Sequence, residues 1–375
     1  MTGLGAAALA AVYALSPLGA PAPDATDRAA SDPGAARLGQ YLFFYRGFSA
    51  DGRIACASCH QPARAFSDGR PLAKGLATGT RNTPTLLNVA YGHWFFWDGR
   101  ADSLWSQPVQ VFENPKEMGS SRQRVARAVE SDRALKRAYA QVFGPMPPLA
   151  GRAAVERVVA NVGKALEAYE RELVSRDAPF DRYVAALRRG DPGADGLLSP
   201  AAQRGLALFV GPAHCTLCHS GPDFSDGEFH NLGLPRLPGR LLDSGRADAV
   251  RELAANPFNG AGRFSDAPRG AARDRLAYLP KPETELGKFK TPTLRNVALT
   301  APYMHDGRFA TLRDVLQFYA QGKAAGHGRV VGQREATLDL VPHLTPGQIS
   351  DLIAFLDSLT GAPLPAALTR QPDTP

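Results

Sequence analysis

The spacing of apolar residues predicts a mainly helical chain. In residues 122–143 and 152–176, apolar side chains such as Val155 and Val159 recur every three or four positions, which is the period of one face of an α-helix. A further helix is predicted to begin at Thr345, where the run Thr-Pro-Gly-Gln combines a capping box with Pro at the first helical position. Strict alternation of apolar and polar residues, typical of a half-buried strand, is scarce.

The chain begins with an apolar segment that has no charged side chain through residue 23. Residues 3–15 form an apolar run, Pro17 interrupts it, and small residues follow. This pattern predicts a secretory signal peptide over residues 1–22, with a misassigned start codon or an uncleaved anchor as the alternatives. No stretch reaches the roughly 20 apolar residues of a membrane span, so we expect no membrane span in the mature chain.

Length and composition favour a globular protein of two domains, although three are also compatible with 375 residues. Hydrophobic residues make up 44% and charged residues 21% of the chain, which excludes a wholly disordered protein. The 37 glycines and 31 prolines predict long loops between modest helices. A net charge of +7 without a polybasic run argues against nucleic-acid binding and is compatible with an acidic protein partner.

All four cysteines belong to two short motifs of the form C-x-x-C-H. The motifs are Cys56-Ala57-Ser58-Cys59-His60 and Cys215-Thr216-Leu217-Cys218-His219. This is the attachment signature of c-type haem, in which two thiols join the porphyrin and the adjacent His becomes the proximal iron ligand. A structural zinc site needs four ligands close together, and a redox pair needs no His, so both alternatives fit less well. We expect two covalent haems, which are attached outside the cytoplasm, and therefore a periplasmic protein.

A second duplication follows each motif at a constant offset. Residues 83–90 read TPTLLNVA and residues 291–298 read TPTLRNVA, and a D-G-R turn recurs at Asp98 and Asp306. The chain is therefore predicted to contain two tandem cytochrome c-like haem domains, mainly α, with long loops and little strand. The predicted bounds are 23–190 and 191–365, with a loop insert at 221–285 and a flexible tail at 366–375.

The repeat allows one domain to serve as a control for the other. Tyr319 of the second domain aligns with Val111 of the first. Tyr319 lies four residues after Val315, and Val111 lies four residues after Gln107, so each pair shares one face of a predicted helix. A phenolate can ligate haem iron and a valine cannot. We therefore expect Tyr319 to ligate the second haem and the first haem to be open, although Tyr319 alone would be interpreted as a half-buried aromatic.

Polar residues are predicted to line the open side of the first haem. They are Gln107, Glu113 and Glu117. An open ferric haem beside a carboxylate suits activation of hydrogen peroxide, because the carboxylate takes and returns a proton while the O–O bond is cleaved. One of the two acids is expected to lie on the solvated surface instead.

These features together resemble the bacterial di-haem cytochrome c peroxidase family, and within it the MauG-like branch. The likeness extends from about residue 38 to residue 359. Its further motifs are F-W-D-G-R-A from Phe96, N-P-x-E-M-G from Asn114 and A-P-Y-M-H-D-G-R-F from Ala301.

The resemblance implies a role for each matching position. His60 and His219 would be the proximal iron ligands. Trp97 would lie between the haems and relay electrons. Glu117 would be the distal acid–base group at the first haem, with Gln107 nearby.

The resemblance also implies the second haem's distal ligand and a calcium ion between the haems. Tyr319 stands where ordinary family peroxidases have a Met ligand and where the MauG-like branch has Tyr. The calcium ligands would be Asn82 together with the backbone carbonyls of Thr300 and Pro302, and such hard oxygen ligands suit calcium.

Three departures from the family pattern bear on function. No His occurs between His60 and His93, so the displaceable distal His of ordinary family peroxidases is absent and the first haem should be open at rest. Val111 stands in place of a distal-pocket proline. In the family member after which the branch is named, a surface Trp serves the oxidation of a protein substrate. Ala213 occupies the matching position here, so the resemblance does not extend to that substrate.

The resulting hypothesis is a periplasmic di-haem oxidoreductase that uses hydrogen peroxide to form a high-valent di-haem state. This state would oxidise an aromatic side chain, Trp, of a partner protein. One alternative is a cytochrome c peroxidase that reduces hydrogen peroxide to water with electrons from a small cytochrome c or copper protein. A second alternative is a non-enzymatic di-haem electron carrier, which would have two six-coordinate haems.

Overall fold

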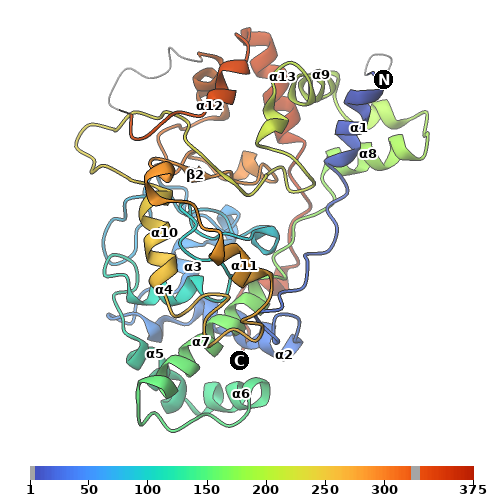
Figure 1. Cartoon of the computed structure of the whole chain (residues 1–375). Helices are drawn as coiled ribbons and strands as arrows, with labels where there is room; N and C mark the ends of the chain where they lie inside the picture. Colours follow the sequence, from blue (N-terminus) through green and yellow to red (C-terminus); the bar gives the residue numbers. More distant parts are fainter. Residues whose placement is uncertain (1–4, 322–329) are drawn as a thin grey trace. The chain divides into compact units, whose positions relative to one another are not determined.

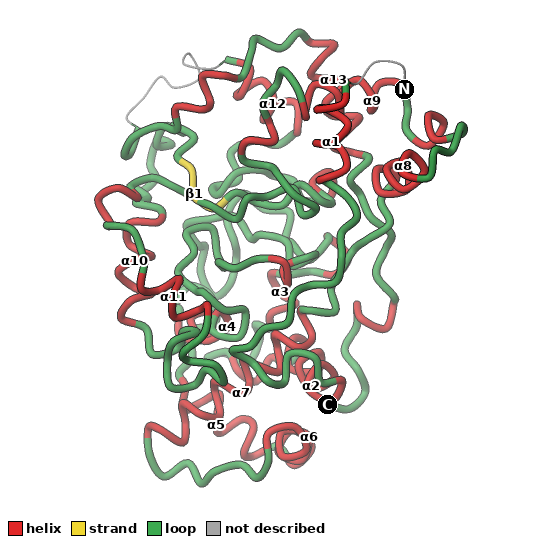
Figure 2. The backbone as a smooth tube through the Cα atoms, turned by 45° about the vertical axis from the view of Figure 1, so that its right-hand side comes forward, coloured by secondary structure: helices red, strands yellow, loops and turns green. Residues whose placement is uncertain are grey.

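The computed structural model describes residues 5–321 and 330–375, so the first four residues of the predicted signal segment lie outside the described residues. Within these ranges the protein consists of helices joined by long loops, with one short two-stranded sheet (Figure 1, Figure 2). The α-helices are α1 (Ala6–Ala14), α2 (Pro33–Phe44), α3 (Cys56–Cys59), α4 (Gln107–Glu113), α5 (Arg122–Ser131), α6 (Arg133–Phe143), α7 (Arg152–Glu170), α8 (Pro179–Arg188), α9 (Pro200–Val210), α10 (Arg246–Ala255), α11 (Ala271–Ala277), α12 (Leu312–Ala320) and α13 (Pro346–Asp357). The strands are β1 (Phe229–His230) and β2 (Phe289–Lys290). The predicted mainly α fold with little strand is confirmed.

The predicted helical segments are present, but residues 122–143 form two helices rather than one. Asp132 lies between α5 and α6 with an extended backbone, and its carboxylate accepts hydrogen bonds from the N–H groups two and three residues later, at 2.8 and 3.1 Å. Such a cap satisfies amide groups that have no partner inside the helix. The capping box predicted at the start of α13 is also present, because Thr345 and Gln348 each bond the other's backbone N–H.

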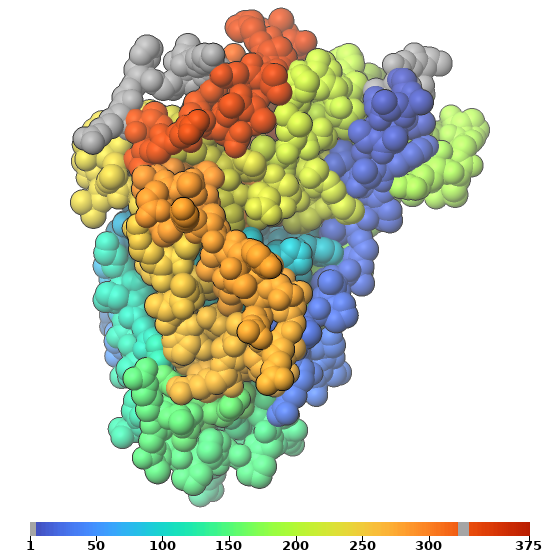
Figure 3. Space-filling model, viewed as in Figure 1, coloured from blue at the N-terminus to red at the C-terminus, as the bar shows by residue number. Residues whose placement is uncertain are grey.

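Two compact units divide the chain, and each is assembled from separate segments. The Cys56 unit comprises residues 21–174, 249–280 and 364–375, and the Cys215 unit comprises residues 1–20, 175–248 and 281–363. The sequence predicts a single division at residue 190. In the structure, each unit instead contains residues from both sides of that position. The predicted insert is itself divided, since its residues 249–280 belong to the Cys56 unit and form part of its surface (Figure 3).

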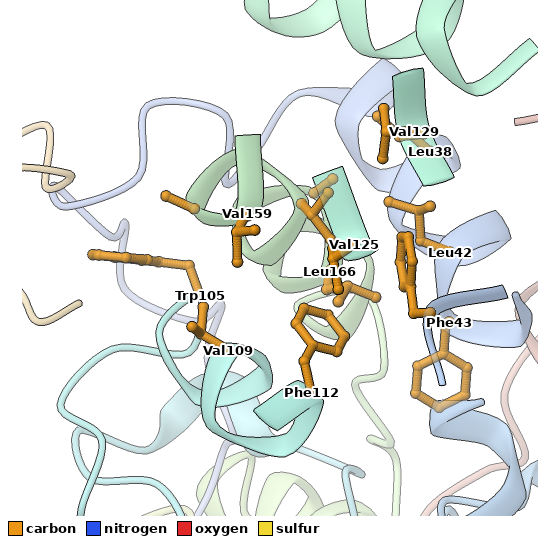
Figure 4. Packing of buried hydrophobic residues seen from close by; sticks show 14 of the residues in the cluster. Leu38, Leu42, Phe43, Trp105, Val109, Phe112, Val125, Val129, Val159 and Leu166 are labelled. Atoms are coloured by element: carbon orange, nitrogen blue, oxygen red, sulfur yellow. The ribbon is translucent and has the colours of Figure 1, made fainter. Parts of the chain in front are cut away.

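The core of the Cys56 unit forms where α2 and α7 pack together. Phe43, Phe112 and Leu166 are completely buried there, beside valines of α4, α5 and α7 (Figure 4). Gly39 permits the close approach of the two helices, since a Cβ atom at this position would lie 1.8 Å from the carbonyl oxygen of Ala165. The one-turn helix α3, which carries the first C-x-x-C-H motif, packs against α2, so this core positions the first motif.

Helices α9 and α13 form the centre of the Cys215 unit. A Cβ atom at Gly205 would lie 2.0 Å from the carbonyl oxygen of Asp351, so glycine is required where these helices meet. Phe180 and Phe355 pack edge to face at 5.6 Å between ring centroids, and Phe224 lies 5.5 Å from Phe180. The short antiparallel sheet of this unit pairs Phe229 with Lys290 and His230 with Phe289.

The N-terminal segment has partners inside the Cys215 unit. Helix α1 packs against α9, and Val12 and Leu15 are buried in the same core. The guanidinium of Arg188 lies 4.7 Å from the ring centroid of Tyr13. No helix among the described residues is long and apolar enough to cross a membrane.

The C-terminal segment has partners inside the Cys56 unit. The Tyr169 hydroxyl donates a hydrogen bond to the carbonyl of Leu368 at 2.6 Å, and the Gln40 amide donates to the carbonyl of Arg370 at 2.8 Å. The sequence predicts a flexible tail over residues 366–375, because prolines and polar residues dominate it. The structure instead gives this tail specific hydrogen-bonded contacts with α2 and α7.

A buried ion pair fixes the start of α8 to the second copy of the repeated loop, residues 291–298. Arg295 is 1% exposed and binds both carboxylate oxygens of Asp181, at 2.8 and 3.0 Å, while its Nε donates to the carbonyl of Pro222 at 2.6 Å. Burial raises the pKa of Asp181, but the hydrogen bonds and charge of Arg295 outweigh burial and hold that pKa below its usual value. The pair therefore contributes stability above the unfolded-state pKa of Asp, which is lost as the pH falls through the lower folded-state pKa.

Substituting Arg295→Met is expected to destabilise the Cys215 unit by about 3–5 kcal/mol, because it leaves the Asp181 carboxylate buried and unpaired. Urea unfolding of the holoprotein, followed by far-ultraviolet circular dichroism, measures this loss. The matched control is Arg204→Met, which removes an equally bidentate pair with Asp351 from an exposed Arg and should cost at most about 1 kcal/mol. Equal losses in the two variants would contradict the assignment.

Candidate haem sites

The first C-x-x-C-H motif forms a single helical turn, α3. The N–H of Ala55 donates to the Ser58 hydroxyl at 3.0 Å, and the N–H of His60 donates to the carbonyl of Cys56 at 2.8 Å. This turn places both thiols within one short stretch of helix, immediately before the His. Cys59 and Cys56 are free thiols rather than a disulfide, as attachment of a porphyrin through two thioether bonds requires.

The second motif has the same hydrogen-bonding pattern. The N–H of His219 donates to the carbonyl of Cys215 at 2.9 Å, as His60 does to Cys56. Cys215 and Cys218 are also free thiols. The duplication seen in the sequence is therefore a duplication of local structure.

Both proximal-ligand candidates are held in the same tautomer. The Nδ1 atom of His60 lies 3.1 Å from the carbonyl oxygen of Phe66, and the Nδ1 atom of His219 lies 2.9 Å from that of Phe224. A carbonyl oxygen only accepts, so each Nδ1 carries the proton and each Nε2 presents a lone pair, as a metal-ligating His requires. Burial lowers the pKa of both rings, which keeps them neutral and able to ligate.

The two carbonyl acceptors are aimed by unusual backbone conformations. Phe66 has φ +57° and Phe224 has φ +54°, in the left-handed region that a bulky side chain rarely adopts. Both rings are buried, so packing holds the backbone in this conformation. The repeat therefore includes, at each site, a Phe of positive φ whose carbonyl accepts the hydrogen bond of the His ring.

The thiols fit covalent attachment better than zinc binding. Burial raises the pKa of Cys59 to about 11 and that of Cys215 to about 12, and each motif brings only two thiols and one His together, fewer than the four ligands of a structural zinc site. Within the described residues, Cys218, Asp226 and His230 are close enough to hold a metal ion. His230 bridges two carboxylates instead, that of Asp226 at 2.8 Å and that of Glu335 at 3.1 Å.

The surroundings of His230 favour its protonated form. Its ring donates to the Asp226 carboxylate, and this hydrogen bond, the neighbouring Cys218 and Glu335 raise the pKa of His230 to about 11. A protonated imidazole has no lone pair to offer a metal. The donor sets of both motifs therefore fit a c-type haem, held by His60 in the Cys56 unit and by His219 in the Cys215 unit.

The structure separates the two acids that the sequence places near the first haem. Glu113 is 39% exposed and pairs with Arg122 at 2.8 Å on the surface. Glu117 is half-buried, accepts a hydrogen bond from the Asn114 amide at 3.1 Å, and lies close enough to Cys59 to raise the pKa of that thiol. Only Glu117 therefore faces the first attachment motif.

The electrostatic surroundings of Glu117 suit a group that exchanges protons. Burial raises the pKa of its carboxyl group, and the nearby Arg100 opposes this shift. The backbone of the residue is held by a hydrogen bond from the N–H of Leu76 at 3.0 Å. Gly75 makes this contact possible, since a Cβ atom there would lie 2.6 Å from the carbonyl oxygen of Glu117.

Gln107 is the first residue of α4 and is half-buried, and Val111 follows it by one turn on the same helix. Their predicted place on the open side of the first haem remains a prediction. Helix α4 belongs to the same unit as Glu117 and the first attachment motif.

Trp97 donates its indole N–H to the backbone carbonyl of Asn82 at 3.0 Å, within the Cys56 unit. The Asn82 side chain in turn donates to the carbonyl of Arg70 at 2.8 Å, and Asn82 is 8% exposed. The neighbouring Asp98 is paired with Arg81 and Arg100. The segment that carries Trp97 is thus tied to the segment just before the first repeat loop.

Two of the three predicted calcium ligands lie in the other unit. Thr300 donates its hydroxyl to the carbonyl of Val297 at 3.1 Å, and the peptide between Ala301 and Pro302 is cis. Asn82 belongs to the Cys56 unit, while Thr300 and Pro302 belong to the Cys215 unit. Calcium binding by these residues remains a prediction.

Tyr319 lies on α12 within reach of the second attachment motif. Its hydroxyl group is buried, and the proximity of Cys218 and Cys215 adds to the effect of burial in raising its pKa. Thr311 caps α12 through a capping box with Asp314, which fixes the rotation of the helix. Tyr319 thus lies near the thiols of the second motif, and its ligation of the second haem remains a prediction.

Sequence reasoning missed several residues that shape these sites. The repeat motif D-G-R contains Arg100, but only the structure shows that this Arg lies near Glu117. The carbonyls of Phe66 and Phe224 carry no residue-type signal, because any residue supplies a carbonyl. Phe66 follows His60 by six residues and Phe224 follows His219 by five, and this spacing alone does not reveal their φ angles.

Comparison with known proteins agrees with this site. A family model described as di-haem cytochrome c peroxidase matches residues 33–189. The methylamine utilization protein MauG of Methylorubrum extorquens is 34% identical over 342 residues, covering 89% of this chain and 80% of that protein. The cytochrome-c peroxidase IdrP1 of Denitromonas iodatirespirans is 36% identical over 339 residues, covering 86% and 80%. The crystal structure of the dihaem peroxidase BthA of Burkholderia thailandensis has a TM-score of 0.68 and 28% identity, covering 92% and 91%.

The chain belongs to the di-haem cytochrome c peroxidase family. It is thus a haem peroxidase of the oxidoreductase class, and the family implies two c-type haems, which matches the two donor sets described above.

Proposed function

We propose that the protein uses hydrogen peroxide at the first haem to oxidise an aromatic side chain, Trp, of a partner protein. The observation that supports this most is the inequality of the two sites. Tyr319 lies near the thiols of the second motif, whereas at the first motif Glu117 lies near Cys59 and Val111 stands at the position that aligns with Tyr319. A proton-exchanging acid at the first haem suits cleavage of peroxide, and an anionic ligand at the second haem suits storage of an oxidising equivalent.

Each haem, when bound, supplies an iron centre that can accept and hold oxidising equivalents. The residues around each haem determine how that iron centre reacts. Glu117 accepts a proton from peroxide and returns it to the departing oxygen, while Gln107 can orient the bound peroxide by hydrogen bonding. Arg100 beside Glu117 favours the carboxylate form that accepts the first proton.

Tyr319 favours storage of an oxidising equivalent at the second site. An anionic oxygen ligand stabilises higher oxidation states of iron, whereas the thioether of Met favours the reduced state. Trp97 would relay electrons between the sites, and calcium held by Asn82, Thr300 and Pro302 would fix the segments that carry them. Export by the segment 1–22 would place the protein in the periplasm, where c-type haem is attached.

An alternative function is reduction of peroxide to water with electrons from a small cytochrome c or copper protein. The similarity to cytochrome-c peroxidase IdrP1 favours it. The Tyr at position 319 argues against it, because a haem that accepts electrons readily from a donor protein benefits from a ligand that raises its potential.

Electron paramagnetic resonance of the ferric holoprotein tests the proposal. We expect one high-spin signal from the open haem at His60 and one low-spin signal from the haem at His219. Addition of hydrogen peroxide should abolish the high-spin signal. Two low-spin signals at rest would contradict the open site and favour a simple electron carrier.

A further inference from the structure

Trp105 is connected to a carboxylate by a hydrogen-bonded chain that can carry a proton. The indole N–H of Trp105 donates to the Thr26 hydroxyl at 2.9 Å, and that hydroxyl donates to the Asp24 carboxylate at 2.7 Å. Trp105 is completely buried, Thr26 is 6% exposed, and Asp24 is half-buried. The chain therefore leads from the core of the Cys56 unit, where Trp105 lies beside Val109 (Figure 4), towards solvent.

We infer that Trp105 is a redox-active residue that holds an oxidising equivalent as a neutral indole radical, passing its proton through Thr26 to Asp24. This inference rests on the proposed function, because the oxidant is the first haem after reaction with peroxide. It gives the protein a third place, besides the two haems, at which an oxidising equivalent can reside.

The proton acceptor distinguishes Trp105 from Trp97. The indole N–H of Trp97 donates to a backbone carbonyl, that of Asn82, which is too weak a base to take a proton. An oxidised Trp97 would therefore keep its proton and its positive charge, which suits rapid return of an electron. An oxidised Trp105 can lose its proton to a hydroxyl group that is itself bonded to a carboxylate, which suits a longer-lived state.

A buried ion pair lies beside Trp105. The ammonium group of Lys164 lies 5.6 Å from the centre of the Trp105 ring, is 3% exposed, and is paired with the Asp266 carboxylate at 2.5 Å. Because this pair is compensated, the hydrogen-bonded path through Thr26 is what favours loss of the indole proton.

Further carboxyl groups lie near the hydrogen-bonded path from Trp105 to Asp24. Glu167 is completely buried and accepts a hydrogen bond from the backbone N–H of Trp105 at 3.0 Å. Burial and the neighbouring Asp24 and Asp27 raise the pKa of Glu167 well above its usual value. The remaining charges facing this network are those of Lys164, Arg171 and Asp266.

The step is balanced in electrons and protons. One electron leaves the Trp105 indole and reduces the peroxide-oxidised first haem by one equivalent. The indole Nε1 proton moves to the Thr26 oxygen as the Thr26 hydroxyl proton moves to Asp24. The products are a neutral indole radical, an intact Thr26 and a protonated Asp24, and no further reactant is needed.

Freeze-quench electron paramagnetic resonance of the holoprotein after addition of hydrogen peroxide tests the inference. We expect a Trp radical whose spectrum is the same in H₂O and D₂O, because a neutral indole radical has no exchangeable proton on nitrogen. Trp105→Phe should abolish the signal, whereas the control Trp94→Phe, which replaces a half-buried Trp of the same unit, should retain it.

Variants of the proton path separate a redox role from a packing role. Thr26→Val keeps the shape of the side chain and removes the hydroxyl, so the signal should be lost or become sensitive to D₂O. Thr26→Ser restores the hydroxyl and should restore the wild-type spectrum. Asp24→Asn removes the proton acceptor while keeping the hydrogen bond, and should shorten the radical's lifetime.

Each contrary outcome has a definite meaning. A radical that persists in Trp105→Phe, or a wild-type radical that is sensitive to D₂O, overturns the inference. Loss of the high-spin haem signal on peroxide addition without any Trp radical overturns the inference but leaves the proposed function standing. A high-spin signal that peroxide does not change overturns both.

Discussion

Replacement of Glu117 by Gln is expected to lower kcat/KM for hydrogen peroxide by roughly 10²- to 10⁴-fold, the usual contribution of a positioned acid–base group. The amide fills the same space and can still pair with Asn114, which donates to the carboxylate at 3.1 Å, but it cannot take a proton from peroxide. Steady-state assays with an artificial electron donor measure this loss. Haem content and the resting spectrum should be unchanged.

The pH dependence of the rate gives an independent signature of Glu117. Burial raises the pKa of this carboxyl group above its ordinary value of 4.5, in spite of the opposing charge of Arg100. The carboxylate is the form that accepts a proton, so the rate should fall as the pH drops through this raised pKa. The acidic limb should therefore lie above pH 4.5 in the wild type and disappear in Glu117→Gln.

The surface acid Glu113 is the matched control for this experiment. It is paired with Arg122 and is 39% exposed, so Glu113→Gln should leave both the rate and the acidic limb unchanged. An equal loss in the two variants, or an acidic limb that survives in Glu117→Gln, would remove Glu117 from its assigned role.

Replacement of Tyr319 by Phe is expected to abolish the low-spin ferric signal of the second haem and leave the high-spin signal of the first unchanged. The ring still fills the space beside Cys215 and Cys218, but the oxygen that would ligate the iron is gone. Without an anionic ligand the second haem should no longer stabilise a high oxidation state. Electron paramagnetic resonance before and after peroxide measures both effects.

A second substitution at this position distinguishes ligation from packing. Tyr319→Met restores a ligand of a different kind, so the low-spin signal should return, with a higher reduction potential than in the wild type. Redox titration of the second haem measures that shift. A low-spin spectrum that is the same in the wild type and in Tyr319→Phe would show that Tyr319 is not a ligand.

Local sequence patterns predicted the parts of the molecule that depend on local interactions. The capping box at Thr345, the two attachment motifs and the position of Tyr319 on a helix all follow from spacing within a few residues. The break at Asp132 was missed because the apolar period continues across it. Asp132 is a good N-cap as well as a tolerated helix residue, and the sequence does not decide between the two.

Non-local packing determined what the sequence could not predict. Glu113 and Glu117 are the same residue type four positions apart, and only the loop that contacts residues 116 and 117 shows which one is half-buried. The assembly of the Cys56 unit from three separate segments likewise depends on contacts between residues far apart in the chain. The hydrogen bond from Trp105 to Thr26 spans 79 residues, so neither residue signals it.

The interleaving of segments has a consequence for the order of biosynthesis. The Cys56 unit needs residues 249–280 and 364–375 to be complete, so its packing cannot be finished before those segments have been synthesised. Its attachment motif, although first in the sequence, would then remain accessible to the haem-attachment machinery until they arrive.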